Sequence, residues 1–500
     1  MRLQRFSCRY LRLAVCLGVC AGLAIACKGT QPEPTERKRT VVLSTEFHDE
    51  RAGTEASKEV QEQIGLVNSP ELVKYVQGIG KRLVRYAPRR SFDYHFSVVN
   101  QFEPNAFALP GGYVYLTRGL LALINSEDEL ANVLGHEIAH SANRHAAAQQ
   151  EFARRQNPFT LPWVRMSNLA SYGRDQERAA DQGGQTMAAK AGYDPAGMVT
   201  FLSRLGGVER LVSGISRVPS LASTHPGTIE RVADCAARAR AIPWRRDPSV
   251  ETGLAAYLAR VEGIALGVNP AEGVFEGDRF LHPDLDFHIQ FPHGWRPQNS
   301  HVAVGAISPR GDAVIFLKGH GVARDAKLAA EEFVQAHEKE YGLRVTRAQH
   351  VQLRAANAYR VGVEAVLGGQ SLAAEMTFIP YKGSMYRVTG VAPARVADQF
   401  LGRARNTVRS FRPLTPDERN SIRQLSLRVV KALPDEDLVA LGLRTGNGWG
   451  PQRTAVLNGI SSNTRFQGGE LLKIAHSEPY RPSGDPAFQL SEEIAQIRQP

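Results

Sequence analysis

The segment 135–140, with the sequence GHEIAH, carries the clearest chemistry in this chain of 500 residues. His136 and His140 are four residues apart, so in a helix both imidazoles leave the same face. Two neutral imidazoles on one face suit zinc, which prefers nitrogen ligands in a tetrahedral arrangement. Glu137 can take a proton from a water molecule that attacks a peptide carbonyl beside this metal. The spacing therefore predicts a zinc-dependent hydrolase.

A catalytic zinc ion needs a third protein ligand and one open position. The acidic candidates downstream are Glu151, Asp175, Glu177 and Asp181. The stretch 174–181 has a helical pattern, in which Glu177 and Asp181 share a face. One of these two carboxylates can bind the metal while the other accepts the free N–H of a ligating histidine. An isolated pair with this spacing is more often an ordinary charged helix surface.

Helical periodicity dominates residues 60–265 and must position these side chains. Ser126 and Glu129 form a capping box that begins the metal-binding helix. Other helices are predicted at 72–86, 175–192 and 228–241. A strand is predicted at 112–117, after a Leu-Pro-Gly turn.

Two local features of this region lead to further expectations. Gly183 and Gly184 each cost a helix roughly 1 kcal/mol relative to alanine, so they predict a bend or an early helix end. His145 follows His140 by five residues and is expected to point away from the metal face as a solvated or structural residue.

Four motifs between residues 60 and 245 resemble, in their order, the zinc metallopeptidases of the CAAX-prenyl-endopeptidase and HtpX class. They are Asn105-Ala106-Phe107-Ala108-Leu109-Pro110-Gly111-Gly112, the HEIAH segment 136–140, Glu177-Arg178-Ala179-Ala180-Asp181 and Thr224-His225-Pro226. With no membrane-spanning run after residue 26, the chain looks most like the periplasmic, lipoprotein-type (BepA-like) members. The resemblance implies a multidomain protein whose mainly α-helical domain, of the zincin (gluzincin) type, carries a small edge-strand sheet.

The resemblance also implies a role for each residue of the predicted metal site. His136, His140 and Glu177 are then the ligands of one zinc ion per chain, and Glu137 is the catalytic base. Asp181 is then the carboxylate that accepts the N–H of a ligating histidine.

Two further motifs allow two readings each. In similar periplasmic members the histidine that corresponds to His225 lies near the metal and can occupy the open position, whereas Thr-His-Pro alone indicates only a helix start. The extended segment Asn105, Ala106, Phe107 and Ala108 can bind a substrate backbone by strand addition, or can be a plain core strand.

Residues 1–26 predict a signal peptide, because four arginines precede a short apolar run at 13–26. Ala24-Ile25-Ala26-Cys27 resembles a lipobox and predicts acylation of Cys27. Lys28, and not Asp, follows this cysteine, and the bacterial sorting pattern that this resembles then favours the outer membrane. Stable anchoring in a membrane needs more than one acyl chain. Ordinary signal-peptidase cleavage and a retained anchor are the alternatives. The polar residues 27–60 are predicted to be a lipid-anchored linker.

Beyond the peptidase domain, at 61–265, the pattern changes to alternating strands with two helices, at 326–342 and 396–411. This predicts an α+β accessory domain at 280–412, with a hairpin turn at 382–384.

Three polar residues in this accessory domain, Asp284, Asp286 and His288, alternate along the chain. In a strand they would leave one face, which suggests a metal site, although such a polar face is usually just solvated.

Residues 426–476 resemble a degenerate LysM module, a small βααβ unit that binds peptidoglycan sugars. The usual Gly-Asp-Thr turn is replaced by Pro434-Asp435-Glu436-Asp437, so a packing module without glycan binding is the alternative. Residues 477–500 are predicted to form a polar tail.

Composition narrows the possible functions. The chain is 43% hydrophobic and 22% charged, as in globular proteins. Its formal charge of +11 falls to +7 without the four leader arginines, too little to indicate nucleic-acid binding. We therefore expect a zinc metalloendopeptidase of the periplasm that acts on protein or peptide substrates, namely misfolded or assembling envelope proteins. The alternative is a non-catalytic envelope assembly factor or peptidoglycan-associated scaffold with a shut or structural metal site.

Overall fold

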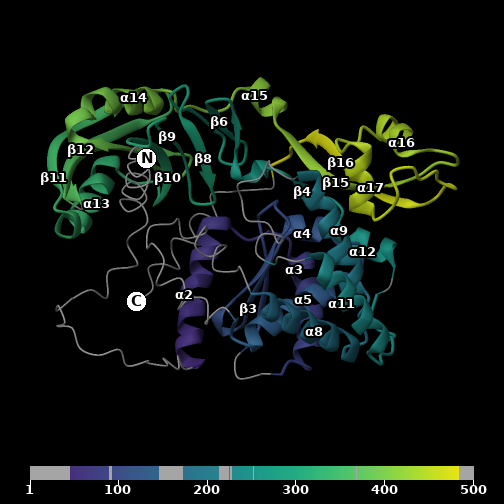
Figure 1. Ribbon diagram of the computed structural model, residues 1–500. Coiled ribbons are helices and arrows are strands. Elements are labelled where there is room, and N and C mark those ends of the chain that lie inside the picture. Colours follow the sequence, from purple (N-terminus) through teal and green to yellow (C-terminus); the bar gives the residue numbers. More distant parts are fainter. Residues whose placement is uncertain are drawn as a thin grey trace, which may run out of the picture. The chain divides into compact units, whose positions relative to one another are not determined.

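The computed structural model describes residues 46–88, 93–145, 173–212, 225, 228–251, 253–367 and 369–482. The predicted signal peptide, Cys27 and the tail after residue 482 lie outside these residues. The described chain forms two compact units, one from residues within 40–269 together with 423–478, the other from 270–422 with the residues after 478 (Figure 1). Within these ranges no helix is both long and apolar enough to cross a membrane.

Helices make up most of the first unit. They are α2 (Glu46–Ile64), α3 (Pro70–Val84), α4 (Arg118–Leu123), α5 (Glu127–Ala142), α8 (Arg174–Lys190), α9 (Gly197–Val212), α11 (Thr228–Ala241) and α12 (Leu254–Val261). The helices predicted at 72–86, 175–192 and 228–241 correspond to α3, α8 and α11. The apolar stripe of α5, with Leu130, Leu134 and Ile138, lies in the main core of this unit.

Part of the predicted linker is helical and belongs to α2. Residues 46–60 were assigned to a polar tether, but they form most of this helix. Ala56, Val60 and Ile64 recur every four residues and pack on one face into a small apolar cluster with Tyr115. The prediction failed there because this narrow apolar stripe lies within an otherwise polar sequence.

A three-stranded sheet lies beside α5. Its strands are β1 (His95–Val99), β2 (Ala106–Leu109) and β3 (Tyr113–Thr117), in the order β1-β3-β2. β3 pairs with β1 in parallel and with β2 in antiparallel orientation, so β2 is an edge strand. The turn between β2 and β3 uses Gly111 and Gly112, whose φ angles of 75° and 88° favour glycine.

Helices α5 and α8 cross with their backbones in contact. α8 continues to Lys190, so the early helix end predicted at Gly183 and Gly184 is wrong. A Cβ atom on Gly184 would lie 2.7 Å from the backbone nitrogen of His136, and one on Gly135 would lie 2.9 Å from the Cα of Gly184. The glycines therefore permit a close helix crossing, and the contact with α5 offsets their low helix propensity.

The last part of the first unit has the element order βααβ. It contains β15 (Arg423–Lys431), α16 (Leu438–Thr445), α17 (Pro451–Asn458) and β16 (Leu471–Pro479). These strands join β4 (Ala265–Leu266) in a sheet of order β16-β15-β4. Leu427, Trp449 and Leu457 belong to the same apolar core as residues of α5. Residues 423–478, hereafter the C-terminal module, are therefore packed as part of this unit.

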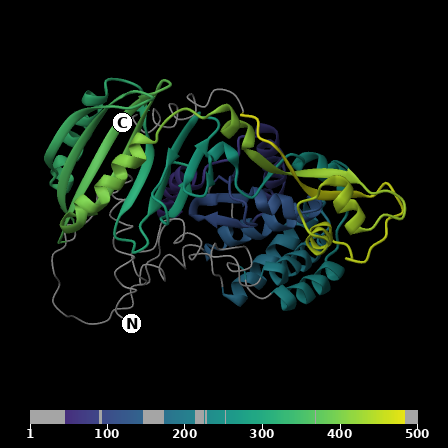
Figure 2. The same cartoon turned by 90° about the horizontal axis from the view of Figure 1, so that it is seen from above.

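The second unit is built on a seven-stranded antiparallel sheet (Figure 2). In spatial order its strands are β11 (Arg344–Gln352), β12 (Asn357–Leu367), β13 (Gln370–Tyr381), β14 (Ser384–Pro393), β10 (Val314–Val322), β9 (Ala303–Ile307) and β8 (Arg296–Ser300). Helices α13 (Ala326–Tyr341) and α14 (Ala397–Arg409) pack into two different apolar clusters of this sheet. The predicted hairpin is confirmed, because Tyr381 pairs with Ser384 across two residues with positive φ.

A smaller sheet and a short helix complete the second unit. They are β5 (Val274–Glu276), β6 (Arg279–His282), β7 (Phe287–Gln290) and α15 (Pro416–Ser421). The sequence suggested a metal site at three polar residues of this region, but each of them contacts a different side chain. Asp284, Asp286 and His288 bind different side chains, respectively Tyr480, Lys382 and Glu418. Among the described residues they form no group that could hold a metal.

We expect Gly184→Ala to disrupt the helix crossing, because the backbone of α5 cannot rotate away from the new methyl group as a side chain would. Overpacking of this kind destabilises a protein by roughly 1–3 kcal/mol. The matched control is Gly78→Ala in α3, where an added Cβ meets nothing within 4 Å. That variant should gain about 0.5–1 kcal/mol in unfolding free energy. Denaturant unfolding together with metal analysis tests both, and a Gly184→Ala protein of wild-type stability would contradict the crossing.

Candidate metal centre

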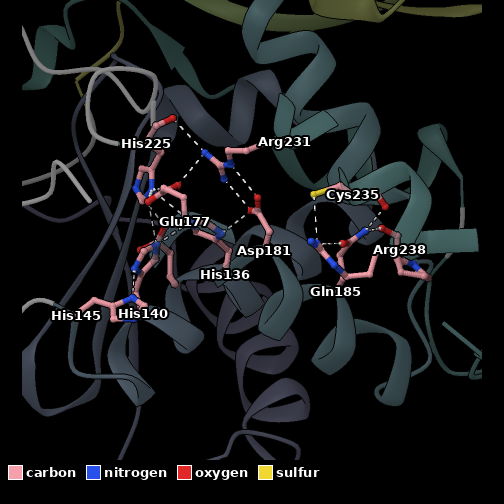
Figure 3. A network of polar contacts seen from close by, with 12 residues as sticks. His136, His140, His145, Glu177, Asp181, Gln185, His225, Arg231, Cys235 and Arg238 are labelled. Carbon is pink, nitrogen blue, oxygen red and sulfur yellow. Dashed lines mark hydrogen bonds and ion pairs between the residues drawn. The ribbon is translucent and has the colours of Figure 1, made fainter. Parts of the chain in front are cut away.

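Three elements bring four metal-binding side chains together. His136 and His140 lie on α5, Glu177 lies on α8, and His225 precedes α11 (Figure 3). One ligand atom of each residue lies within 4.8 Å of all the others, and all four residues are buried. The fold thus collects ligands that are up to 89 residues apart in sequence.

The spacing of these atoms fits a single ion. The Nε2 atoms of His136 and His140 are 2.9 Å apart. The carboxylate oxygens of Glu177 lie 3.6 Å and 3.3 Å from these two nitrogens. Ligands at the usual distance from tetrahedral zinc would be about 3.3 Å from one another. The donor set of imidazole nitrogens and one carboxylate is also the set that zinc prefers.

His225 is the fourth member of the cluster. Its Nδ1 atom lies 2.9 Å from Oε1 of Glu177 and 3.2 Å from Nε2 of His136. Its other ring nitrogen, Nε2, lies 3.7 Å from Oε1 of Glu137. His225 therefore offers a fourth candidate ligand atom in the cluster.

Glu137 points into the same site and is fully buried. Both of its carboxylate oxygens lack a hydrogen-bond partner among the described residues. Burial raises the pKa of Glu137, although His225 and His136 oppose this shift by attraction. A carboxylate whose pKa is moved toward neutrality is suited to accept and return a proton.

Asp181 supports the first histidine of the pair. Its Oδ1 atom lies 2.9 Å from Nδ1 of His136, the ring nitrogen opposite the one in the cluster. Burial lowers the pKa of His136, but the contact with Asp181 outweighs burial and leaves this pKa raised. A carboxylate on the outer nitrogen fixes the tautomer and strengthens the inner nitrogen as a ligand.

Arg231 on α11 contacts these acidic residues, and no sequence motif predicted its role. Its guanidinium donates to both oxygens of Asp181 over 2.7 Å and 2.8 Å. It also lies 2.8 Å from Oε2 of Glu177 and donates to the backbone carbonyl of His225 over 3.1 Å. One cation therefore contacts a cluster carboxylate, the carboxylate behind His136 and the backbone of His225. Its position six residues after His225 was the only signal in the sequence.

The charges around the cluster favour metal binding. Burial alone would raise the pKa of Glu177, but His225, His140 and His136 outweigh it and hold this pKa well below its usual range. Burial and the neighbouring His136 lower the pKa of His140. At neutral pH the carboxylate is thus charged and His140 is neutral, the forms in which both groups bind a metal.

His145 contacts the second histidine, contrary to the expectation that it would point away. Its Nδ1 atom lies 2.9 Å from Nδ1 of His140. Helix α5 ends at Ala142, and Arg144 then takes a left-handed conformation with φ 55°. This turn brings the next side chain back over the helix, which a count along a continuous helix could not predict.

The segment expected to bind substrate lies on the edge strand β2. Asn105 donates its backbone N–H to the Thr117 hydroxyl over 2.9 Å, which fixes the start of β2 against β3. Ala106 and Ala108 are buried, whereas Phe107 is half-buried and stacks on Tyr115 with ring centroids 5.1 Å apart. This segment is both part of the core and a strand edge, so the two readings of the sequence are compatible.

Comparison with known proteins agrees with this geometry. Residues 70–165 and 159–239 match the model of Peptidase family M48. The region that contains the metal centre is thus similar to M48 metallopeptidases.

Three relatives show how far the similarity extends. The beta-barrel assembly-enhancing protease of Escherichia coli is 32% identical over 225 residues, which cover 40% of this chain and 45% of that protein. The protein of the same name from Yersinia pestis is 32% identical over 211 residues, or 37% and 42% of the two chains. The mitochondrial metalloendopeptidase OMA1 of Schizosaccharomyces pombe is 28% identical over 215 residues, or 40% and 63%. This chain spans about half the length of the bacterial relatives.

Solved structures align much more distantly. Cyanobacterial PsbP (CyanoP) from Synechocystis aligns with a TM-score of 0.24 and 13% identity, covering 30% of this chain and 99% of that chain. Similarity at this level is too low to define a shared fold.

We expect Arg231→Met to destabilise the metal-free protein by roughly 3–5 kcal/mol, because it leaves two buried carboxylates without their cation. Bound zinc should reduce this loss, since the ion supplies positive charge to Glu177. Arg178→Met on α8 is the control. Arg178 is half-exposed and forms only loose ion pairs of 3.6–3.8 Å, each worth at most about 1 kcal/mol. Denaturant unfolding with and without zinc tests the prediction, and equal losses in the two variants would contradict it.

Proposed function

We propose that this protein is a zinc-dependent metalloendopeptidase that hydrolyses peptide bonds in misfolded or assembling cell-envelope proteins. The observation that carries the proposal is the convergence of His136, His140 and Glu177 with the buried carboxylate of Glu137, which accepts no hydrogen bond from the described residues. The match to Peptidase family M48 supports the reaction class. The names of the Escherichia coli and Yersinia pestis relatives support the substrate class.

In the proposed mechanism each residue has its own task. His136, His140 and Glu177 hold one zinc ion, and Asp181 orients His136. When bound, zinc supplies Lewis acidity that polarises the scissile carbonyl and lowers the pKa of an attacking water. Glu137 takes the proton from the attacking water and delivers it to the leaving amine.

Strand β2 is the proposed binding site for the substrate backbone. Its position at the sheet edge supports this proposal, because an extended peptide can add to a free strand edge by main-chain hydrogen bonds. Such bonds do not read side chains, which suits an enzyme that acts on unfolded segments of many sequences. Asn105, Ala106, Phe107 and Ala108 would contact the substrate in this way.

The proposed location is the periplasm, with acylated Cys27 anchored in the outer membrane. The lipobox-like sequence before Cys27 supports the anchor. Glycan binding by the C-terminal module remains a weaker proposal, which rests on its βααβ order and its resemblance to LysM modules.

A second candidate function is a non-catalytic assembly factor whose metal site is shut. The position of His225 favours this second function, because its side chain offers the fourth ligand atom.

For the metalloendopeptidase, we propose that His225 gates an active site, so that its removal from the metal permits catalysis. The two functions make opposite predictions for variants of Glu137 and His225.

Glu137→Gln should lower casein cleavage about 10³-fold and should retain one zinc ion per chain, because an amide cannot accept the proton. Zinc content and cleavage of casein by the purified protein check this outcome. Complementation of a deletion strain by the variant would instead support the non-catalytic function.

His225→Ala should raise casein cleavage several-fold at unchanged zinc content, since three protein ligands suffice for a catalytic zinc ion. His293→Ala is the control, because His293 is fully exposed on the second unit and should leave cleavage unchanged. Lower cleavage with normal zinc content would show that His225 assists the reaction and is not a gate.

A further inference from the structure

A buried lysine of the C-terminal module contacts the end of a helix in the peptidase region. Lys473 lies on β16 and is fully buried. Its Nζ atom donates to the backbone carbonyls of Ala122, Leu123 and Ile124 over 2.6, 3.2 and 3.1 Å. These carbonyls end helix α4, where a helix leaves carbonyls unpaired and favours a cation. Three acceptors match the three N–H groups of an ammonium ion.

The chain capped by Lys473 leads directly into the metal-binding helix. Ile124 is the C-cap of α4, and Ser126 is the N-cap of α5, where its side chain accepts from the Glu129 N–H. The Glu129 carboxylate accepts from the Asn125 N–H over 2.8 Å, one residue earlier than in a regular capping box. Side-chain hydrogen bonds therefore fix the turn between the two helices.

A buried ion pair holds the same turn to α9, and a hydrogen bond holds it to the C-terminal module. Arg204 on α9 binds Glu129 through two contacts of 2.6 and 2.9 Å. Asn125 donates its side-chain amide to the carbonyl of Leu457 in α17 over 3.2 Å. Burial and Arg204 lower the pKa of Lys473, and Glu129 opposes both. The lysine thus belongs to a network whose carboxylate lies in the first turn of α5.

We propose that Lys473 is a positioning residue for the metal centre, through which the C-terminal module holds the N-terminus of α5 and thereby the histidines about two and a half and three and a half turns further along it. The proposal rests on the metal centre of the proposed function but does not require proteolysis. It assigns the module a role within the catalytic unit, whether or not the module binds glycan.

The test compares zinc release from full-length variants at a temperature well below their unfolding midpoints. Lys473→Met keeps the length of the side chain but removes the ammonium donor from three carbonyls, of which Leu123 keeps only a 3.4 Å bond from Arg204. We expect zinc transfer to a chelator to accelerate about tenfold, which is the lower end of effects seen for outer-shell partners of metal ligands. The d–d spectrum of the Co²⁺-loaded variant should also change, because the ligands on α5 shift.

Two controls separate this role from general destabilisation. Val60→Ala removes a buried methyl pair from an apolar cluster that contains no α5 residue, so it should lower the unfolding midpoint without changing zinc release. Lys431→Met replaces an exposed lysine of the same module and should change neither. If Lys473→Met lowers the midpoint as Val60→Ala does, with wild-type zinc release and Co²⁺ spectrum, the proposal is overturned.

A milder variant keeps the test decisive if Lys473→Met does not fold. Asn458→Ala removes the two bonds that hold the backbone of Lys473, of 2.7 and 2.9 Å, and should accelerate zinc release in the same direction. Unchanged release would again overturn the proposal. A wild-type protein that binds zinc but cleaves no substrate would contradict the proposed function and leave these comparisons intact.

Discussion

The contact between the backbones of α5 and α8 is the constraint on which the metal centre depends. Two of the proposed ligands lie on α5 and one on α8, and their ligand atoms must lie about 3.3 Å apart to share one zinc ion. Ordinary side chains keep packed helices 8–10 Å apart. Gly135 and Gly184 remove that spacing at the crossing point. Glu177 and Asp181 lie about two turns and one turn before Gly184, so both carboxylates face the histidines of α5.

This close packing creates an electrostatic problem that Arg231 resolves. Glu177 and Asp181 are almost completely removed from water, and two buried carboxylates repel each other. The single guanidinium of Arg231 bonds to both carboxylates. The histidines on α5 also contact these carboxylates. Because Arg231 also binds the carbonyl of His225, the residue that compensates the acids also places the fourth member of the cluster. The pairing of the two acids and the placement of His225 are therefore coupled through one guanidinium.

Sequence spacing predicted the parts of this site that depend on a single helix. His136, Glu137 and His140 share one helical segment, as do Glu177 and Asp181, so a helical period was enough to group them. His145 was misplaced because the left-handed turn at Arg144 depends on how α5 ends and not on a repeat. Residues such as Arg231 were missed because their roles come from tertiary contacts, and one arginine on an amphipathic helix resembles any other. Helix α2 was missed because its apolar stripe is narrow.

The C-terminal module shows why a resemblance in element order does not define a role. Its βααβ order suggested an independent binding unit, and several of its apolar residues do form a cluster of their own. Leu427, Trp449 and Leu457, however, belong to the main core, and β15 pairs with β4 of the first unit. A fully buried ammonium group is tolerated only where its desolvation is offset by partners. Lys473 bonds to the carbonyls at the end of α4. If the module separated from the rest of the unit, these carbonyls would lose this donor, and the ammonium group would lose its partners. An autonomous glycan-binding domain on a flexible linker would not need such a contact, whereas a module that is packed as part of the first unit would.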